Sequence, residues 1–531
     1  MTFEEAIKNN PHLGKYVKEF QEKNGVIPTF VPQLSRDIDK KNVNVIYPVG
    51  DPIFIHIYGN AKIEPRYYSI EPEMTEIEKG KYGEILSLIL KKTPQEPAAD
   101  NSEKLRAHLK KLFEKVIAKG ETTKDKGKIA LTEEQFKKIE YFIDRNIVGH
   151  GIIEPIIRDP YLEDINNIGK YSIFVVHKIF GMIETNIHFS SDEELDEWMR
   201  VMSERIARPV SDFRPIADGA MPDGSRINII YSKEVSRRGG SFTMRKFNAI
   251  PTSVIQLIKW GSISAEMGAY LWLCLENGMN VFVSGETASG KTTALNSILP
   301  FIQSKGKIYS VEDTAEVLAP QETWQQMITR ETGPESSRVD MFSLLKLALR
   351  SRPTYVIVGE IRGVEGAVAF QAMQAGNSVM ATFHASSVKK LIQRITGDPI
   401  KVPVTFIDNL NVVMILQAVY RQGVFLRRCV SMEEIEGYLE EAKGVITRAV
   451  FQWDSTNDKH HFRGLNNSYI LENVIAGKLG YSDKKKIYKE LEIRANVLQK
   501  MTEQNITDYY KVKDIIWAFE RNGVNGLPFE L

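Results

Sequence analysis

Cysteine and long apolar runs are what this chain most conspicuously lacks. Its two cysteines, Cys274 and Cys429, lie far apart in apolar surroundings, so neither a disulfide framework nor a CxxC metal site is expected, and a reducing compartment fits. No stretch reaches about 18 uninterrupted apolar residues, and the start, MTFEEAIKNN, has no basic segment followed by an apolar one. We therefore expect a cytoplasmic protein that is neither exported nor membrane-spanning.

An excess of charge of one sign is also missing. Lysine and arginine number 69 against 68 aspartates and glutamates, which gives a formal net charge of +1. This balance argues against a protein whose main task is to neutralise nucleic-acid phosphates, although a total does not speak against a local basic groove. Apolar residues at 43% and charged residues at 26% are typical of globular chains. The length suggests roughly three folded units.

Polar segments punctuated by proline or glycine divide the chain. TPQEPAADNSEK (93–104) and GETTKDKGK (120–128) are typical of loops or linkers. Hairpins are predicted at the FG step of YSIFVVHKIFGMIETNI and around the glycine pair between DGSRINIIY and SFTMRKF. We expect an N-terminal extension of uncertain role over residues 1–130 and a smaller α/β N-terminal domain over 131–247. A hinge around Pro251, over 248–253, leads to a larger α/β domain over 254–531.

The larger domain alternates strands with helices, which is the pattern of a parallel sheet wrapped by crossover helices. The candidate strands are NVFVSG, KIYSVED, TYVIVGE and SVMATFH. Each ends in a polar or charged residue or in a glycine-rich turn, and open α/β sheets bind ligands at the carboxyl ends of their strands. This edge is therefore the predicted site.

A phosphate-binding loop follows the first of these strands. GETASGKT fits GxxxxGK[ST], directly after an apolar strand and before the helical stretch TTALNSILPFI. Glycines let backbone N–H groups surround the phosphates, the lysine contributes a cation and the following threonine offers a hydroxyl to Mg²⁺. A chance glycine-rich turn is the alternative, and the strand, loop and helix in register argue against it. The predicted ligands of ATP are Gly285, Glu286, Thr287, Ala288, Ser289, Gly290, Lys291, Thr292 and Thr293.

Acidic residues and a histidine end the neighbouring strands. Glu360 is the candidate for organising Mg²⁺ and water together with Thr292, and Glu312 with Asp313 supplies a second acidic pair. A strand inserted between the loop strand and the acidic strand is typical of the RecA-like branch of P-loop enzymes, so we predict a RecA-like domain with a central, mostly parallel sheet. His384 is expected to sense the γ-phosphate through a ring N–H, with a purely structural role as the alternative.

Arginines are frequent around these motifs, and guanidinium groups suit the spread charge of a transferring phosphoryl group. The candidates are Arg330, Arg350, Arg352 and Arg362. Arg350 and Arg352 also end a predicted helix, where they would equally favour its C-terminal dipole. The preceding domain contains further arginines that are candidates to act in trans, namely Arg226, Arg237, Arg238 and Arg245. The alternative is that they simply lie on a solvent-exposed face.

The order of these segments resembles one family, the ATPases of type II and type IV secretion and of type IV pili. GETASGKTT resembles its Walker A box, IYSVEDTAEV its Asp box, LRSRPTYVIVGEIRG its Walker B stretch and MQAGNSVMATFHA its His box. The resemblance runs from about Leu131 to the C-terminus. RPIADGAMPDGSRINIIYSKEVSRRGGSFTMRKF and VFQWDSTNDKHHFRG resemble the archaeal branch, which includes archaellum motor and archaeal pilus ATPases.

The resemblance implies a homohexameric ATPase at the inner face of the cell membrane. Its expected partners are a polytopic membrane platform protein, accessory filament-machine subunits and anionic lipid, with no nucleic acid. In the family, the Asp-box and Walker B glutamates handle catalytic water and metal, which here indicates Glu312 and Glu360, and the His-box histidine corresponds to His384. Many bacterial members carry a four-cysteine zinc module, which two cysteines cannot form, so no zinc is expected.

The expected function is ATP hydrolysis that powers assembly or rotation of an archaeal type IV pilus-like filament, or secretion. Two alternatives stay open from the residues. The first is a hexameric nucleic-acid motor with the same RecA-like core, which would need a basic channel studded with aromatic residues. The second is a non-catalytic scaffold that binds nucleotide only to assemble.

Overall fold

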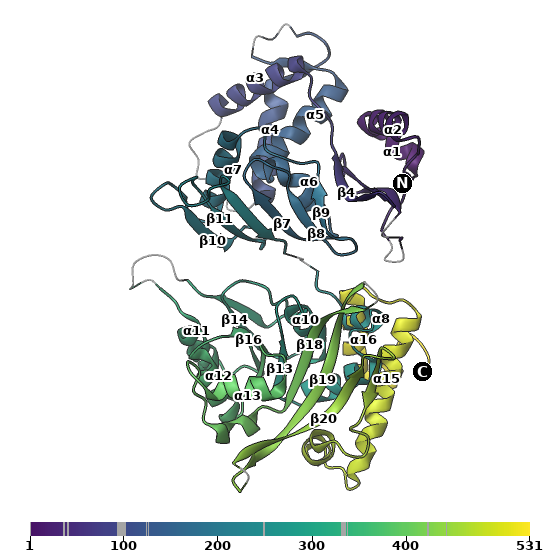
Figure 1. The fold of residues 1–531 in the computed structure, drawn as a ribbon, viewed down its shortest axis with the longest axis vertical. Helices are drawn as coiled ribbons and strands as arrows, with labels where there is room; N and C mark the ends of the chain where they lie inside the picture. The colour runs from purple at the N-terminus through teal and green to yellow at the C-terminus, as the bar shows by residue number, and fades with distance from the viewer. Residues whose placement is uncertain are drawn as a thin grey trace. The chain divides into compact units, whose positions relative to one another are not determined.

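The chain divides into two compact units, Met1–Phe247 and Asn248–Leu531, called unit 1 and unit 2 below (Figure 1). The structure, a computed structural model, describes residues 2–34, 38–39, 42–92, 102–123, 125, 127–247, 250–330, 336, 338–421, 424–441 and 443–531. Both expected linkers and the first two residues of the expected hinge, 248–253, lie wholly or partly outside these residues. Each unit has its own cores of buried apolar side chains.

Unit 1 is built on a mixed sheet, ten-stranded within the described residues, in the order β1-β2-β3-β4-β9-β8-β7-β12-β11-β10. The strands are β1 (Thr29–Phe30), β2 (Val43–Pro48), β3 (Phe54–Asn60), β4 (Ile63–Ile70), β7 (Leu162–Ile168), β8 (Phe174–His177), β9 (Gly181–Thr185), β10 (Ile216–Ala220), β11 (Arg226–Ile230) and β12 (Ser241–Arg245). The helices are α1 (Phe3–Asn9), α2 (Pro11–Asn24), α3 (Glu76–Lys92), α4 (Ser102–Val116), α5 (Glu133–Ile143), α6 (Glu154–Arg158) and α7 (Asp192–Arg205). A short parallel pair joins β5 (Ile117–Lys119) to β6 (Ile129–Leu131).

The boundary expected near residue 131 does not separate compact units. Strand β4, from the expected extension, pairs in parallel with β9, from the expected α/β domain, with Arg66 opposite Glu184. One apolar core contains Tyr47 from the first segment and Ile165 from the second. The two segments therefore share a sheet and a core, because the edge of β4 is completed by strands that occur more than a hundred residues later.

Both hairpins predicted in unit 1 are confirmed. Strands β8 and β9 pair antiparallel with His177 opposite Gly181, so the chain turns at the predicted FG step. Strands β11 and β12 also pair antiparallel, with Ile230 opposite Ser241. Local turn chemistry was sufficient to find these pairings.

Unit 2 contains the predicted parallel sheet. Strands β15-β14-β16-β17-β13-β18 run parallel, and β18-β19-β20-β21 continue the sheet antiparallel, which makes nine strands in the described part of the unit. The strands are β13 (Val281–Gly285), β14 (Ile308–Glu312), β15 (Trp324–Ile328), β16 (Tyr355–Ile361), β17 (Ser378–Phe383), β18 (Val412–Arg421), β19 (Val424–Leu439), β20 (Gly444–Asp454) and β21 (Lys459–Phe462).

The strand that lies between the loop strand β13 and the acidic strand β16 is β17. KIYSVED, which separates the two motifs in sequence, instead forms β14 on the far side of β16. Sequence order and spatial order differ because each crossover connection can return its strand to either side of the sheet. The RecA-like insertion is present, and the His-box strand supplies it.

Helices cover both faces of this sheet (Figure 1). Side chains of β13 alternate between two cores, with Val281 and Val283 in one and Phe282 in the other. The first core takes α8 (Val254–Lys259), α9 (Ala265–Glu276), α10 (Lys291–Ile298), α15 (Ile487–Glu503) and α16 (Tyr509–Asn522), and the second takes α11 (Met341–Arg350), α12 (Glu365–Gln374) and α13 (Val388–Thr396). No helix in the described parts of either unit is long and apolar enough to cross a bilayer.

Candidate functional site

The predicted phosphate loop joins the carboxyl end of β13 to the start of α10. Gly290 is the N-cap of α10 and has a φ of +88°, a conformation that favours glycine. A Cβ on Gly285 would lie 2.3 Å from the Leu416 carbonyl oxygen, so the strand end accepts only glycine. Ala288 also has a positive φ, +62°. The loop is therefore a wound turn that leads its backbone N–H groups into a helix N-terminus, which suits an anion.

Polar side chains inside the loop fold back on it. The Lys291 ammonium, on a largely buried side chain, donates to the Glu286 carbonyl oxygen at 3.1 Å. The buried Ser289 hydroxyl donates to the same oxygen at 2.7 Å. Glu286, Thr287 and Ala288 are exposed, as is Thr293, whereas Thr292 is half-buried in the first turn of α10. The lysine is thus held over the loop, where it places a cation beside any bound phosphate.

A buried serine ties the phosphate loop to the His box. The Ser284 hydroxyl donates to the Ala385 carbonyl oxygen at 2.8 Å and accepts the Ala385 N–H at 3.2 Å. These bonds align the carboxyl ends of β13 and β17. His384 follows β17 directly, so its ring is fixed at the edge of the sheet where the loop lies.

His384 and Glu360 are in contact. His384 Nε2 lies 2.9 Å from Glu360 Oε1, and the Arg362 guanidinium donates to Glu360 Oε2. Oε1 is buried and has no hydrogen bond of acceptable geometry, so the close approach to the imidazole is not a well-directed bond. Burial, with the Lys291 cation as the next cause, holds the pKa of His384 below its usual value of 6.5. The imidazole is therefore neutral near pH 7 and can still donate one ring proton.

Glu312 has very different surroundings. It is 1% exposed, and its Oε2 accepts the backbone N–H groups of Glu316 and Val317 at 2.6 and 2.7 Å. Its Oε1 accepts from the Gln326 amide at 3.0 Å. Burial raises the pKa of this carboxyl above its usual value, against the opposing effect of these donors. Both oxygens of Glu312 are thus engaged by the protein itself.

The two glutamates lie on neighbouring strands. A Cβ on Gly359 would lie 2.9 Å from Glu312 Cγ, so the residue before Glu360 packs directly on Glu312. Arg330 follows the carboxyl end of β15, where the Thr329 N–H donates to the Glu312 carbonyl oxygen at 2.9 Å. The structure therefore brings Lys291, Glu312, Glu360, His384 and Arg330 to one edge of the sheet.

Arg350 and Arg352 lie at the opposite edge. They flank the end of α11, before β16 begins, and the Ser351 carbonyl oxygen accepts from Lys307 just ahead of β14. Strand β16 begins at Tyr355, and its rise of about 3.3 Å per residue carries Glu360 roughly 16 Å from that residue. The arginines precede Tyr355, so their separation from Glu360 is roughly 20 Å. Neither arginine reaches the phosphate loop of its own chain, because a helix that returns to start a parallel strand ends at the amino edge.

The arginines predicted in unit 1 also separate. Arg226 and Arg245 lie opposite each other on β11 and β12 and bind Asp218 and Asp164, with closest distances of 2.7 and 3.4 Å. Arg238, like Arg237, lies in the connection at the other end of this hairpin, with its guanidinium 5.7 Å from the centre of the Tyr171 ring. The four arginines therefore form one pair on the strands and a second group of two in the connection.

Two further arginines adjoin the site and were missed by the sequence analysis. Arg427, on β19, donates from Nε to the Ala288 carbonyl oxygen at 3.0 Å. Arg394, on α13, donates to the His384 carbonyl oxygen and stacks over Phe383 with 5.2 Å from Cζ to the ring centre. No motif marks either residue, since both reach the site only through the pairing and packing of distant elements.

The residues present fit a magnesium nucleotide. A glycine-bounded cradle, a lysine held over it and a half-buried threonine hydroxyl match the donors that phosphate and Mg²⁺ require. The buried Glu360 Oε1, which lacks a well-formed hydrogen bond, is an acceptor that a hydrated cation or a water molecule would satisfy. Thr292 and Glu360 are accordingly the residues that fit the metal.

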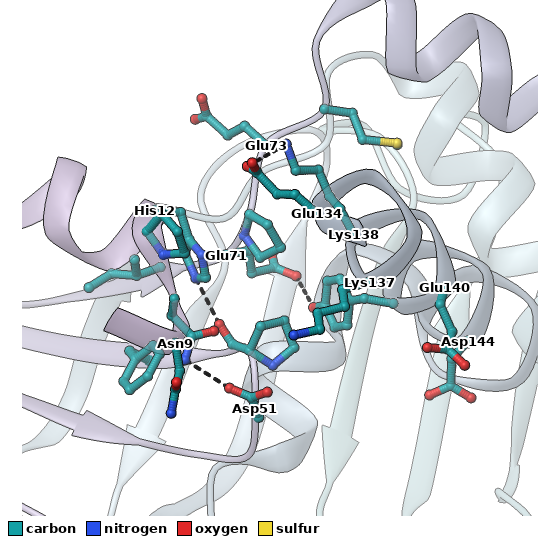
Figure 2. Close-up of a pocket in the computed structure, with 18 of the residues that line it drawn as sticks. Asn9, His12, Asp51, Glu71, Glu73, Glu134, Lys137, Lys138, Glu140 and Asp144 are labelled. Carbon is teal, nitrogen blue, oxygen red and sulfur yellow. Dashed lines mark hydrogen bonds and ion pairs between the residues drawn. The ribbon is translucent and has the colours of Figure 1, made fainter. Parts of the chain in front are cut away.

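A cavity of about 1520 Å³ is lined by residues of unit 1, whereas the motifs above belong to unit 2 (Figure 2). Its walls come from α1, α2, β4, α4 and α5 and carry charges of both signs. Many of these charges pair with each other, as in Arg106–Asp144 at 2.7 Å and Lys110–Glu140 at 3.3 Å. The cavity therefore presents no surface of one sign that would select a phosphate.

Comparison with known proteins finds a family model and several relatives. The model of the family described as Type II/IV secretion system protein matches residues 146–506. The uncharacterised protein MJ0900 of Methanocaldococcus jannaschii is 54% identical over 99% of this chain and 98% of its own length. The type IV secretion system protein VirB11 of Bartonella quintana is 24% identical over 39% of this chain and 67% of its own length. The solved structure of the Legionella pneumophila ATPase DotB is 16% identical, covering 68% of this chain and 88% of its own, with a TM-score of 0.39.

Proposed function

The chain belongs to the type II/IV secretion system protein family, and on that premise we propose that it hydrolyses ATP as the hexameric motor of an archaeal pilus-like filament or secretion machine. The family consists of ATPases of secretion and pilus machines. The observation that carries the proposal for this chain is the convergence of Lys291, Glu360 and His384 at one sheet edge. The extensive identity with a protein from an archaeon supports the archaeal branch.

Each residue at the edge has a proposed task. The N–H groups from Gly285 to Thr293 and the Lys291 ammonium bind the β- and γ-phosphates of ATP. Mg²⁺, held by Thr292 and Glu360, supplies charge neutralisation when bound. His384 donates a ring proton to the γ-phosphate, for which the neutral imidazole is suited. Arg330 adds a cation from the same edge.

Glu360 is proposed as the residue that orients the attacking water. The resemblance implied that Glu312 and Glu360 both handle catalytic water and metal. The contacts of Glu312 support a different role, because three donors already occupy its two oxygens. The buried Glu360 Oε1 is the better acceptor for a water proton. Glu312 then acts by holding the turn after β14 and the position of β16.

Arginines acting in trans and domain motion complete the proposal. Arg226 and Arg245 in unit 1 are proposed to reach the nucleotide of a neighbouring subunit, with Arg238 in a separate role. Arg350 and Arg352, which lie at the opposite edge of the sheet from the loop of their own chain, are proposed to serve a neighbouring subunit. Closure of the subunit around ATP, and its reopening after phosphate release, are proposed to swing unit 1 about the segment 248–253. This motion is proposed to drive a polytopic membrane platform protein. Accessory filament subunits and anionic lipid are the further partners proposed.

Glu360→Gln provides the direct test. The amide keeps the size of the side chain and loses the basic carboxylate, so ATP turnover is expected to fall by about 100-fold or more. ATP affinity, measured by calorimetry, is expected to remain within about threefold. Lys291→Ala is the matched control, and it is expected to abolish nucleotide binding itself.

Three results would contradict parts of this proposal. Undiminished turnover in Glu360→Gln would remove its catalytic role, and undiminished filament or secretion activity would favour the non-catalytic scaffold. Hydrolysis stimulated by DNA or RNA, and not by vesicles containing anionic lipid, would favour the nucleic-acid motor.

A further inference from the structure

The strands β18 and β19 extend past the phosphate loop. The last pairing of β13 joins Gly285 to Leu416, and β18 continues from Gln417 to Arg421. At about 3.3 Å per residue this overhang is roughly 16 Å long. Strand β19 pairs with it antiparallel over the same length. The overhang therefore forms a wall beside the mouth of the loop.

Exposed aromatic rings lie on this wall. Tyr420 is 79% exposed and Phe425 41% exposed, and the two residues are directly opposite in the β18–β19 pairing. Their ring centres are 5.2 Å apart, with the planes inclined at 64°. Aromatic rings on an edge of this kind are not needed for the core of the sheet. We refer to Tyr420 and Phe425 as the aromatic pair.

Arg427 connects the aromatic pair to the phosphate loop. Its guanidinium carbon lies 5.3 Å from the centre of the Phe425 ring, while its Nε donates to the Ala288 carbonyl oxygen. Its Cδ would lie 3.1 Å from a Cβ on Gly290, so the side chain runs along the loop. The loop, the arginine and the aromatic rings thus form one continuous surface on the same side of the sheet.

We propose that the aromatic pair is the platform on which the base of the bound nucleotide stacks. This inference rests on the proposed function and names the part of the site that holds the nucleoside. A base has a flat π-face, and stacking it on an aromatic ring stabilises the bound state. A guanidinium beside the ring adds to this stabilisation. With the phosphates in the loop, the base is the apolar part of the ligand within reach of this wall. Arg427 is the positioning residue: it holds Ala288 of the phosphate loop beside the aromatic pair.

The test compares a ligand with a base and a ligand without one. Binding of ADP and of inorganic tripolyphosphate to the full chain is measured by calorimetry for the wild type and for Tyr420→Ala/Phe425→Ala. The double substitution is expected to weaken ADP by about 5- to 100-fold and to leave tripolyphosphate within about twofold. Phe425→Trp, which keeps a stacking face, is expected to retain ADP affinity.

Two controls accompany the double substitution. Phe213→Ala removes a ring that is 98% exposed in unit 1 and is expected to change neither ligand's affinity. Unchanged tripolyphosphate affinity in the double variant reports that the loop is still folded. Unaltered ADP affinity, or an equal loss for both ligands, would overturn the platform. A wild-type chain that binds neither ligand would instead overturn the proposed ATPase.

Discussion

At the scale of single residues, two glutamates of the same sheet edge show how surroundings assign roles. Glu312 is saturated by protein donors, whereas one oxygen of Glu360 is buried beside an imidazole without a directed hydrogen bond. An acceptor without a hydrogen bond costs free energy unless a ligand satisfies it. The difference favours Glu360 for chemistry and Glu312 for support.

His384 provides a prediction on pH. Because the pKa of His384 in the folded chain lies below 6.5, the folded state binds the second ring proton less readily than the unfolded chain does. The contribution of the neutral His384 ring to the free energy of unfolding is therefore complete above pH 6.5. It is lost as the pH falls below 6.5. In histidine NMR, with His384→Gln identifying the signal, the midpoint is expected below 6.5 and is expected to rise in Lys291→Ala. A midpoint at 6.5 or above, or one insensitive to Lys291, would contradict this placement.

At the scale of elements, α11 and β16 decide which arginines can serve the site of their own chain. A helix that returns to begin a parallel strand ends at the amino edge, and the ligand edge lies at the other end of that strand. The sequence motif contains both arginines and Glu360 within eleven residues, from Arg350 to Glu360. The strand between them turns this closeness in sequence into a separation of roughly 20 Å.

Arg350→Ala and Arg352→Ala are accordingly expected to leave ADP affinity within about twofold of the wild type. The reason is distance, since neither side chain approaches the loop of its own chain. Calorimetry on each variant checks this, with Arg427→Ala as the matched control that is expected to weaken ADP. A large loss in either variant under conditions where the chain is monomeric would contradict the edge assignment.

At the scale of the whole molecule, the chain forms two compact units with separate cores, Met1–Phe247 and Asn248–Leu531. Unit 1 combines the expected extension and the expected α/β domain into one sheet. Unit 2 contains the complete phosphate loop and both glutamates. The proposed motor requires a nucleotide site that stays folded in unit 2 while unit 1 moves.

A fragment of residues 250–531 is therefore expected to fold alone and to bind ADP within about threefold of the full chain. The reason is that the core, the loop and the proposed base platform all belong to unit 2. Calorimetric unfolding of the full chain is expected to show two transitions, one of which matches the fragment. A fragment that aggregates or fails to bind ADP would contradict the independence of the unit.

The sequence by itself determined the phosphate loop, the parallel strands that lead to that loop and to Glu312, Glu360 and His384, and the hairpins of unit 1. These features depend on local periodicity and turn chemistry, which neighbouring residues encode. It did not reveal β15, β18 and β19, nor Arg394 and Arg427, because no motif marks a residue whose position depends on long-range pairing.

Only the tertiary structure decided the order of the strands, the shared sheet of unit 1 and the different surroundings of Glu312 and Glu360. The same holds for the separation of Arg238 from Arg226 and Arg245. Strand order and burial result from which distant segments pair and pack, and those contacts join residues tens to hundreds of positions apart. Local sequence therefore specifies the chemical groups of this site, and packing specifies which of them meet.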